Sequence, residues 1–207
     1  MSQITVRTAE LEDLLMIAEL KRDAYGVRGY CSRKRAQEQY LNMKNEFALM
    51  AEIDGKTVGT MSVIYAEGGR KLPSDEYFPI QTDEVRKTSG KIAYYGTFAV
   101  QSGMWARGEC SVGLALIREA IRRAKQEAIN AKIIIVHPRH VSFYMALGFE
   151  EVARRDNMPG LEKAPAVMMV LAGVALQSLF AKYTGDNKNL YQKPEHRLAH
   201  NEESAVA

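Results

Sequence analysis

The chain has 207 residues, of which 46% are hydrophobic and 26% charged, and its formal net charge at pH 7 is +3. These values predict one soluble globular domain with a full core, and so small a positive charge does not indicate nucleic acid as a partner. The 2 cysteines exclude a disulfide scaffold and form no zinc motif. Because no signal peptide is visible and no apolar run reaches the ~20 residues that span a bilayer, we expect a cytoplasmic protein without a bound metal.

The first half of the chain alternates between short apolar strands and amphipathic helices. We expect strands at residues 4–7, 46–53 and 57–66 and helices at residues 10–25 and 33–43. Asp54-Gly55 between the second and third strands is a strong signal for a two-residue hairpin. Residues 68–90 contain Pro73 and Pro79 and predict a long connection, and such connections on compact domains are often functional.

The second half of the chain predicts strands that alternate with helices. We expect strands at residues 91–100, 131–136, 150–154 and 166–171, and helices at residues 109–129 and 138–147. Strand pairs, then strand–helix–strand–helix, then a hairpin describe an α/β sheet of mixed direction. We expect a single domain over residues 1–185 and a mobile polar tail over residues 186–207.

The most informative stretch is residues 133–151, IIIVHPRHVSFYMALGFEE. Its isoleucine-rich start predicts a buried strand, and Pro138 suits the first position of a helix because its missing N–H is not needed there. Gly148 closes this helix, since a positive φ is cheap for glycine. The hydroxyl of Tyr144 is thereby delivered beside a strand end, a common position for a site in an open α/β sheet.

Three segments carry a resemblance to a known family. They are residues 137–144 ahead of Leu147-Gly-Phe, residues 72–78 followed by residues 83–86, and Ala99-Val100 at a strand end. Through them, residues 4–172 resemble the GNAT acyltransferases, and more specifically the N-acyl amino acid synthases, a branch related to acyl-homoserine-lactone synthases. The resemblance implies the GNAT fold, a mixed central sheet flanked by helices and splayed between its fourth and fifth strands.

The resemblance also implies a reaction in which an amine attacks a thioester. The departing thiol has a pKa of ~8.5, so a positioned tyrosine with a pKa of ~10 can supply its proton, and Tyr144 matches the family's tyrosine. The alternative is that Phe143 and Tyr144 only pack the short helix. Backbone N–H groups of the fourth strand would polarise the thioester carbonyl, and those residues are Phe98, Ala99 and Val100. The alternative is an ordinary, fully paired central strand.

The segment after this strand bears on the acyl donor. GNAT enzymes that use coenzyme A have a basic, glycine-rich turn here, whose N–H groups hold the pyrophosphate. The chain instead has Ser111, Val112 and Gly113 at the corresponding positions, with an acidic Glu109 ahead of them. This departure favours a phosphopantetheine thioester carried on an acyl carrier protein. The alternative is that the segment has drifted while coenzyme A still binds.

A second departure concerns the general base. The synthase family has an acidic residue in the fourth strand and an arginine three positions later, where this chain has Tyr94 and Thr97. Tyr94, Tyr95 and Thr97 are candidates to orient the amine or a water, but none is a base at neutral pH. A histidine titrates near pH ~6.5, so His137 is a candidate base, and a backbone-bonded strand-end residue is the equally supported alternative.

The sequence therefore predicts an N-acyltransferase that moves an acyl group, expected to be a fatty acyl group, to an amine such as an amino acid. A coenzyme A-dependent N-acetyltransferase and a non-catalytic GNAT-fold sensing module are the two alternatives. Several methionines could line an acyl tunnel or fill the core. The basic residues of the long helix could dock an acidic carrier protein or face solvent, and they are Arg118, Arg122, Arg123 and Lys125. The sequence does not determine the acceptor amine, the acyl chain length or the oligomeric state.

Overall fold

The computed structural model describes residues 3–27, 47–67, 69–104, 111–157 and 164–184. Within these segments a 7-stranded sheet has the order β1-β2-β3-β4-β5-β7-β6. Its strands are β1 (Ile4–Thr8), β2 (Phe47–Ile53), β3 (Lys56–Tyr65), β4 (Ile92–Val100), β5 (Ala131–Val136), β6 (Glu150–Arg155) and β7 (Ala166–Ala172). Strands β4 and β5 are parallel, and all other neighbours are antiparallel, which confirms the predicted sheet of mixed direction.

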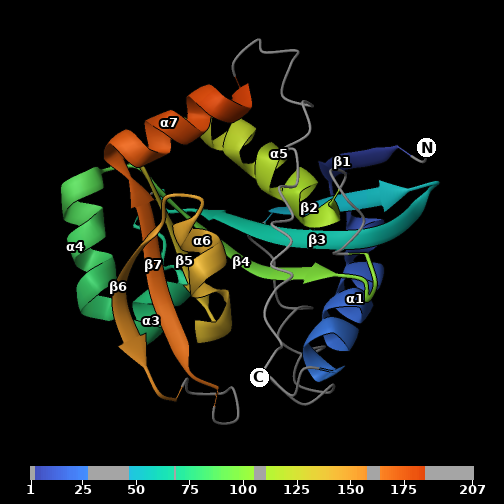
Figure 1. Ribbon diagram of the computed structural model, residues 1–207, viewed down its shortest axis with the longest axis horizontal. Coiled ribbons are helices and arrows are strands. Elements are labelled where there is room, and N and C mark those ends of the chain that lie inside the picture. Colours follow the sequence, from blue (N-terminus) through green and yellow to red (C-terminus); the bar gives the residue numbers. More distant parts are fainter. Residues whose placement is uncertain (1–2, 28–46, 68, 105–110, 158–163, 185–207) are drawn as a thin grey trace, which may run out of the picture.

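Helices cover both faces of this sheet. They are η1 (Leu11–Asp13), α1 (Leu14–Val27), α3 (Pro73–Tyr77), α4 (Pro79–Ser89), α5 (Val112–Gln126), η2 (Pro138–His140), α6 (Val141–Met145) and α7 (Gly173–Thr184). Figure 1 shows α5 and α7 on the upper side of the sheet and α1 and α3 on the lower side. None of the helices in the described segments combines the length and the apolar character needed to cross a membrane.

The core is divided by the sheet, and the division explains the side-chain pattern of the central strands. Tyr95 and Ile134 pack into the cluster under α5 and α7. Tyr94 and Ile133 point to the other face, into a cluster with residues of α3 and α4. Successive strand residues face opposite sides, so a strand covered on both sides is largely apolar, as β5 is apart from the buried Lys132.

Local turn chemistry is confirmed at the first hairpin. Asp54 and Gly55 both have positive φ, 50° and 73°, which is the conformation of the turn that this residue pair favours between antiparallel strands. On the next strand, Gly59 allows close packing of α5, because a Cβ built on it would lie 2.5 Å from Cγ1 of Val112. The start of α5 therefore rests directly on β3.

The prediction of a long connection over residues 68–90 is wrong, because two helices, α3 and α4, occupy most of it. Each begins with a proline, a position where the absent N–H costs nothing. The Asp75 carboxylate accepts the Leu72 N–H at 2.6 Å and is bound by both Arg86 nitrogens at 2.9 and 2.8 Å. These bonds tie the two helices together.

A further helix, α7, was not expected from the sequence. It follows β7 directly, at Gly173, whose φ of 56° turns the chain out of the sheet. The helix expected at residues 33–43 and the tail over residues 186–207 lie outside the described residues.

Candidate active site

The parallel strands β4 and β5 separate part of the way along their length. Their ladder has 4 residue pairs, from Ile92–Ala131 to Tyr95–Ile134, although β4 continues to Val100. In Figure 1 the far end of β4 runs with β3 toward α1, away from β5. The predicted splay is therefore present, and within the described strands the edge of β4 beyond Tyr95 has no strand partner on the side of β5.

A β-bulge in β4 marks this separation. Two residues of β4, Thr97 and Phe98, lie opposite the single residue Met61 of β3. Thr97 has a φ of 43°, a left-handed conformation that is rare for a β-branched residue. Bulges bend a strand and redirect its side chains and its N–H groups, which explains why β4 leaves β5 here.

Helix α1 contacts the bulge through two polar side chains. The Lys21 Nζ donates to Ser62 Oγ at 2.9 Å, and the Thr97 hydroxyl donates to the same oxygen at 2.5 Å. The Tyr25 hydroxyl donates to the Phe98 carbonyl at 3.3 Å. The candidate residue Thr97 is thus held from below the sheet.

Tyr144 lies on α6, which follows the end of β5 through η2. Its ring makes edge contacts with Phe143 and Phe149, at centroid distances of 5.1 and 5.6 Å. Burial raises the pKa of Tyr144 to about 12. Within the described part of the chain its hydroxyl has no hydrogen-bond partner. The group is therefore protonated throughout the neutral range and available to donate.

His137 is the residue before η2 and accepts the Arg139 N–H through Nδ1 at 3.3 Å. Burial, and secondly the charge of Arg139, lower the pKa of His137 below its usual value. The ring is therefore neutral at pH 7. Because a neutral imidazole has one lone pair, and Nδ1 uses it for Arg139, the Nε2 carries the proton. A base role requires the ring to release this backbone bond.

The structure places Tyr94 and Tyr95 on opposite faces of the sheet. The Tyr94 ring lies over Gly96, whose built Cβ would be 2.5 Å from Cε1 of that ring. Tyr95 is 7% exposed and donates to the Ala120 carbonyl of α5 at 3.2 Å. Burial raises its pKa well above the usual value. Tyr94 lies on the same face as α1, whereas Tyr95 is separated from it by the sheet.

Ser111, Val112 and Gly113 form the beginning of α5. The Ser111 side chain caps the helix by accepting the Leu114 N–H at 3.4 Å. Val112 and Gly113 are buried, and Val112 packs on Gly59 of β3. The segment over residues 105–110, which includes Glu109 and Cys110, lies outside the described residues.

The basic face of α5 is engaged within the chain. Arg122 and Arg123 both bind the Glu119 carboxylate, at 2.6 and 2.7 Å. Arg123 also donates to Thr8 Oγ1 at 2.6 Å, and Lys125 donates to Thr184 Oγ1 at 2.8 Å. Arg122 and Lys125 nevertheless remain exposed on the surface of α5.

Two of the chain's methionines, Met168 and Met169, are fully buried, in the hydrophobic clusters on the two opposite faces of the sheet. Within the described residues, no group of three or more His, Cys, Asp or Glu side chains is arranged to hold a metal ion.

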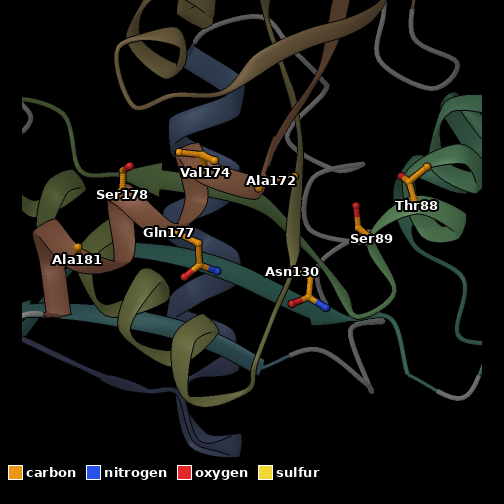
Figure 2. A pocket seen from close by; sticks show the side chains of 9 residues that line it. Thr88, Ser89, Asn130, Ala172, Val174, Gln177, Ser178 and Ala181 are labelled. Atoms are coloured by element: carbon orange, nitrogen blue, oxygen red, sulfur yellow. The ribbon is translucent and has the colours of Figure 1, made fainter.

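A hollow of about 780 Å³ lies at the other end of the central strands. Figure 2 shows its polar lining, with Thr88 and Ser89 at the end of α4, Asn130 ahead of β5, and Gln177 and Ser178 on α7. Ser89 and Asn130 lie just before the first residues of β4 and β5, whereas the two strands separate at the other end, after Tyr95 and Ile134. The hollow is therefore separate from the region of Thr97 and Tyr144.

Sequence reasoning did not identify Lys21, Tyr25 and Ser62 as residues of this region. A signal was present, because Lys21 follows Ile17 by four positions and Ala18 by three and so belongs to the apolar stripe of α1. A lysine within such a stripe is expected to find a polar partner. The partner, Ser62, is 41 residues away in the sequence.

Comparisons with known proteins agree with this geometry. The family model for the N-acyl amino acid synthase FeeM matches residues 16–172. The solved structure of FeeM, from uncultured soil microbes, is 20% identical with a TM-score of 0.72, over 86% of this chain and 96% of that chain. No curated protein matches.

GNAT acetyltransferases share the fold. An aminoglycoside acetyltransferase solved with coenzyme A and kanamycin is 18% identical, with a TM-score of 0.57 over 85% of this chain and 98% of that chain. The ribosomal-protein-S18-alanine N-acetyltransferase from Escherichia coli is 16% identical, with a TM-score of 0.56 over 82% of this chain and 94% of that chain. With the family match covering more than half of its length, the chain belongs to the FeeM family of N-acyl amino acid synthases, shares the fold of the GNAT acetyltransferases and is an N-acyltransferase.

Proposed function

We propose that this acyltransferase moves a fatty acyl group from the phosphopantetheine thioester of an acyl carrier protein to the amine of an amino acid. The observation that carries the proposal is the separation of β4 from β5 beyond Tyr95, where the two described strands no longer pair. A pantetheine arm is an extended chain with two amide groups, and such a chain pairs with an exposed strand edge as a further strand would. The fatty acyl group and the amino-acid acceptor rest on the family.

The reaction consists of the attack of the amine on the thioester and the proton transfers that accompany it. The amine, after losing its proton, attacks the thioester carbonyl, and N–H groups among Phe98, Ala99 and Val100 stabilise the oxyanion that forms. The C–S bond then breaks, the attacking nitrogen loses a further proton as the amide forms, and the thiolate takes the proton of the Tyr144 hydroxyl. The proton from the nitrogen, passed through solvent, restores the Tyr144 hydroxyl. Tyr144 is protonated at neutral pH because burial raises its pKa to about 12.

The start of α5 supports a carrier-protein donor over coenzyme A. Free N–H groups in the first turn of a helix bind phosphate, and their number sets how well a pyrophosphate is held. Ser111 uses the Leu114 N–H for its own side chain. Val112 is packed against β3, so the turn that would hold a nucleotide pyrophosphate is partly occupied by the chain itself.

Competition between donors tests the proposal. The purified protein is given equal concentrations of an acyl carrier protein thioester and the coenzyme A thioester of the same acyl group, with a mixture of amino acids as acceptors. Mass spectrometry of the products should show N-acyl amino acids, formed faster from the carrier protein. Amino acids with a blocked α-amine serve as the acceptor control and should give no product.

Two outcomes contradict the proposal in different ways. A clear preference for the coenzyme A thioester, above all with a short acyl group, identifies a coenzyme A-dependent N-acyltransferase instead. Acylation of the α-blocked amino acids at undiminished rate shows that the acceptor is not the α-amine.

The role of Tyr144 gives a second prediction. Replacing Tyr144 by phenylalanine keeps the edge contacts with Phe143 and Phe149 but removes the proton donor. We expect kcat to fall by about 10²–10⁴-fold with little change in the KM for the donor. Tyr183→Phe, at a tyrosine on α7, is the matched control and should keep the wild-type rate. An unchanged kcat in the Tyr144 variant would assign that residue to packing alone.

A further inference from the structure

We propose that Lys21 and Tyr25 on α1 are positioning residues, which hold the bulge of β4 in the shape that acyl transfer requires. The inference rests on the proposed function, because the shape matters only if the N–H groups beyond the bulge meet a thioester. Neither residue is expected to touch the substrates. Both act through the two bulge residues, Thr97 and Phe98.

The contacts form a clamp from one helix face. Lys21 and Tyr25 are four residues apart, so their side chains leave α1 on the same side. Lys21 is 0% exposed and Ser62 is 2% exposed. Ser62 Oγ accepts from Lys21 Nζ at 2.9 Å and from the Thr97 hydroxyl at 2.5 Å. Tyr25 reaches the next residue, at the Phe98 carbonyl. Each residue of the bulge thus has its own connection to α1.

The bulge needs such a clamp because Thr97 is strained. Its φ of 43° places a β-branched side chain in the left-handed region, where steric contacts with the backbone are unfavourable. A residue of this kind persists only where its surroundings determine its conformation. The hydroxyl bond to Ser62, which Lys21 holds in place, is the interaction that fixes the side chain of Thr97.

The clamp reaches the reaction centre through the peptide plane. The Phe98 carbonyl shares a planar peptide group with the Ala99 N–H, which faces β3 opposite Thr60. A bond that fixes this carbonyl therefore also fixes the strand just ahead of Val100, whose N–H faces away from β3. Tyr25 makes that bond at 3.3 Å. Donors that stabilise an oxyanion are effective when their direction is set before the reaction. Loosening the clamp should therefore lower the rate of the chemical step more than it weakens binding of the donor.

A double-mutant experiment distinguishes a clamp from a direct role in binding. Lys21→Met is measured in the wild type, in Thr97→Gly and in Thr97→Ala, and each rate is compared within its own background. Glycine adopts a positive φ without strain, whereas alanine does not, and both lack the hydroxyl. Glu19→Gln, at an exposed position of α1, is the surface control.

We expect Lys21→Met to lower kcat by up to about 100-fold in the wild type, with the KM for the donor nearly unchanged. In Thr97→Gly the same change should cost less than about threefold, because a glycine bulge needs no clamp. Thr97→Ala, still strained but without the hydroxyl, should be as slow as Lys21→Met and should not be rescued. An equal loss in the wild-type and glycine backgrounds would overturn the proposal and assign Lys21 to the substrates.

Amide hydrogen exchange gives a readout that needs no activity. Lys21→Met should speed exchange at residues 97–99 and leave β2 and β7 protected, and Thr97→Gly should remove the difference. Should Lys21→Met fail to fold, Tyr25→Phe removes a single oxygen and should raise exchange at Ala99. Unchanged exchange in these variants refutes the clamp. If the variants show faster exchange but the wild-type protein transfers no acyl group, the proposed function is refuted and the clamp remains as a structural device.

Discussion

Lys132 of β5 should make the stability of this protein depend on pH in the alkaline range. Its side chain is 2% exposed, and burial lowers its pKa from 10.5 to about 7. Its Nζ lies 5.1 Å from the ring centroid of Tyr95 and 5.4 Å from that of Phe180. Between pH 7 and 10.5 the unfolded chain binds a proton at Lys132 that the folded chain does not, so the free energy of unfolding rises with pH.

The size of the effect follows from the shift. Each pH unit contributes about 1.4 kcal/mol, so the shift of Lys132 is worth at most about 5 kcal/mol over this range. Lys132→Met keeps most of the apolar volume and has no proton to lose. We therefore expect the variant to be more stable than the wild type at pH 7, and the two proteins to converge as the pH approaches 10.

Urea denaturation at a series of pH values, followed by circular dichroism, measures this difference. Lys56→Met, at an exposed lysine at the start of β3, is the control for loss of a surface charge. A wild-type free energy of unfolding that is flat between pH 7 and 10 would refute the reasoning. A Lys132→Met variant less stable than the wild type at pH 7 would refute it equally, since the ammonium would then be a net stabilising group.

Three other predictions concern the scaffold and the general base. Asp75→Asn should cost about 1.5–3 kcal/mol in denaturation, because it breaks the paired bonds with Arg86. Burial alone would raise the pKa of Asp75, but its hydrogen bonds lower it below 3.8, so the deficit should be full above that pH and shrink as the pH falls further. Gly59→Ala should cost about 1–3 kcal/mol, because its Cβ would lie 2.5 Å from Val112, and a thermal melt measures the loss. If His137 is the base, its lowered pKa places the midpoint of the acid limb of the rate profile below pH 6.5, and His137→Gln removes that limb; superimposed profiles would exclude it.

The parts of the fold that depend on local pattern could be predicted from the sequence. The turn at Asp54-Gly55 needs two left-handed residues and has the pair that favours them. Strand β5 is apolar except at Lys132, and its predicted bounds, residues 131–136, are those observed. In both cases the property that decides the structure belongs to residues adjacent in the chain.

The two helices over residues 68–90 were missed because proline can either interrupt a helix or begin one. Pro73 and Pro79 indicate a loop when they are considered as residues that break elements, but each is the first residue of a helix. The decisive contact, between Asp75 and Arg86, joins residues of two different helices. Each of these helices is too short or too polar to show a clear periodic pattern alone.

For the site, the sequence indicated the positions of Tyr144 and Thr97 but not what holds them. Tyr144 was predicted from its place between a strand end and Gly148, which is a local signal, and from the family resemblance. The bulge could not be found in this way, because the one extra residue on β4 is defined only against β3. The separation of Tyr94 from Tyr95 follows from strand alternation and was available from the sequence.

The structure shows which side chains surround Thr97, a position at which the sequence departs from the pattern that the resemblance implies. The resemblance implies an arginine at this position of the strand, and this chain has Thr97 there. A cationic side chain, Lys21, reaches this part of the sheet from α1 and is joined to the Thr97 hydroxyl through Ser62 Oγ. The two arrangements differ in what they require of the fold, because the lysine depends on the packing of α1 against β3 and β4, whereas an arginine would depend on the strand alone.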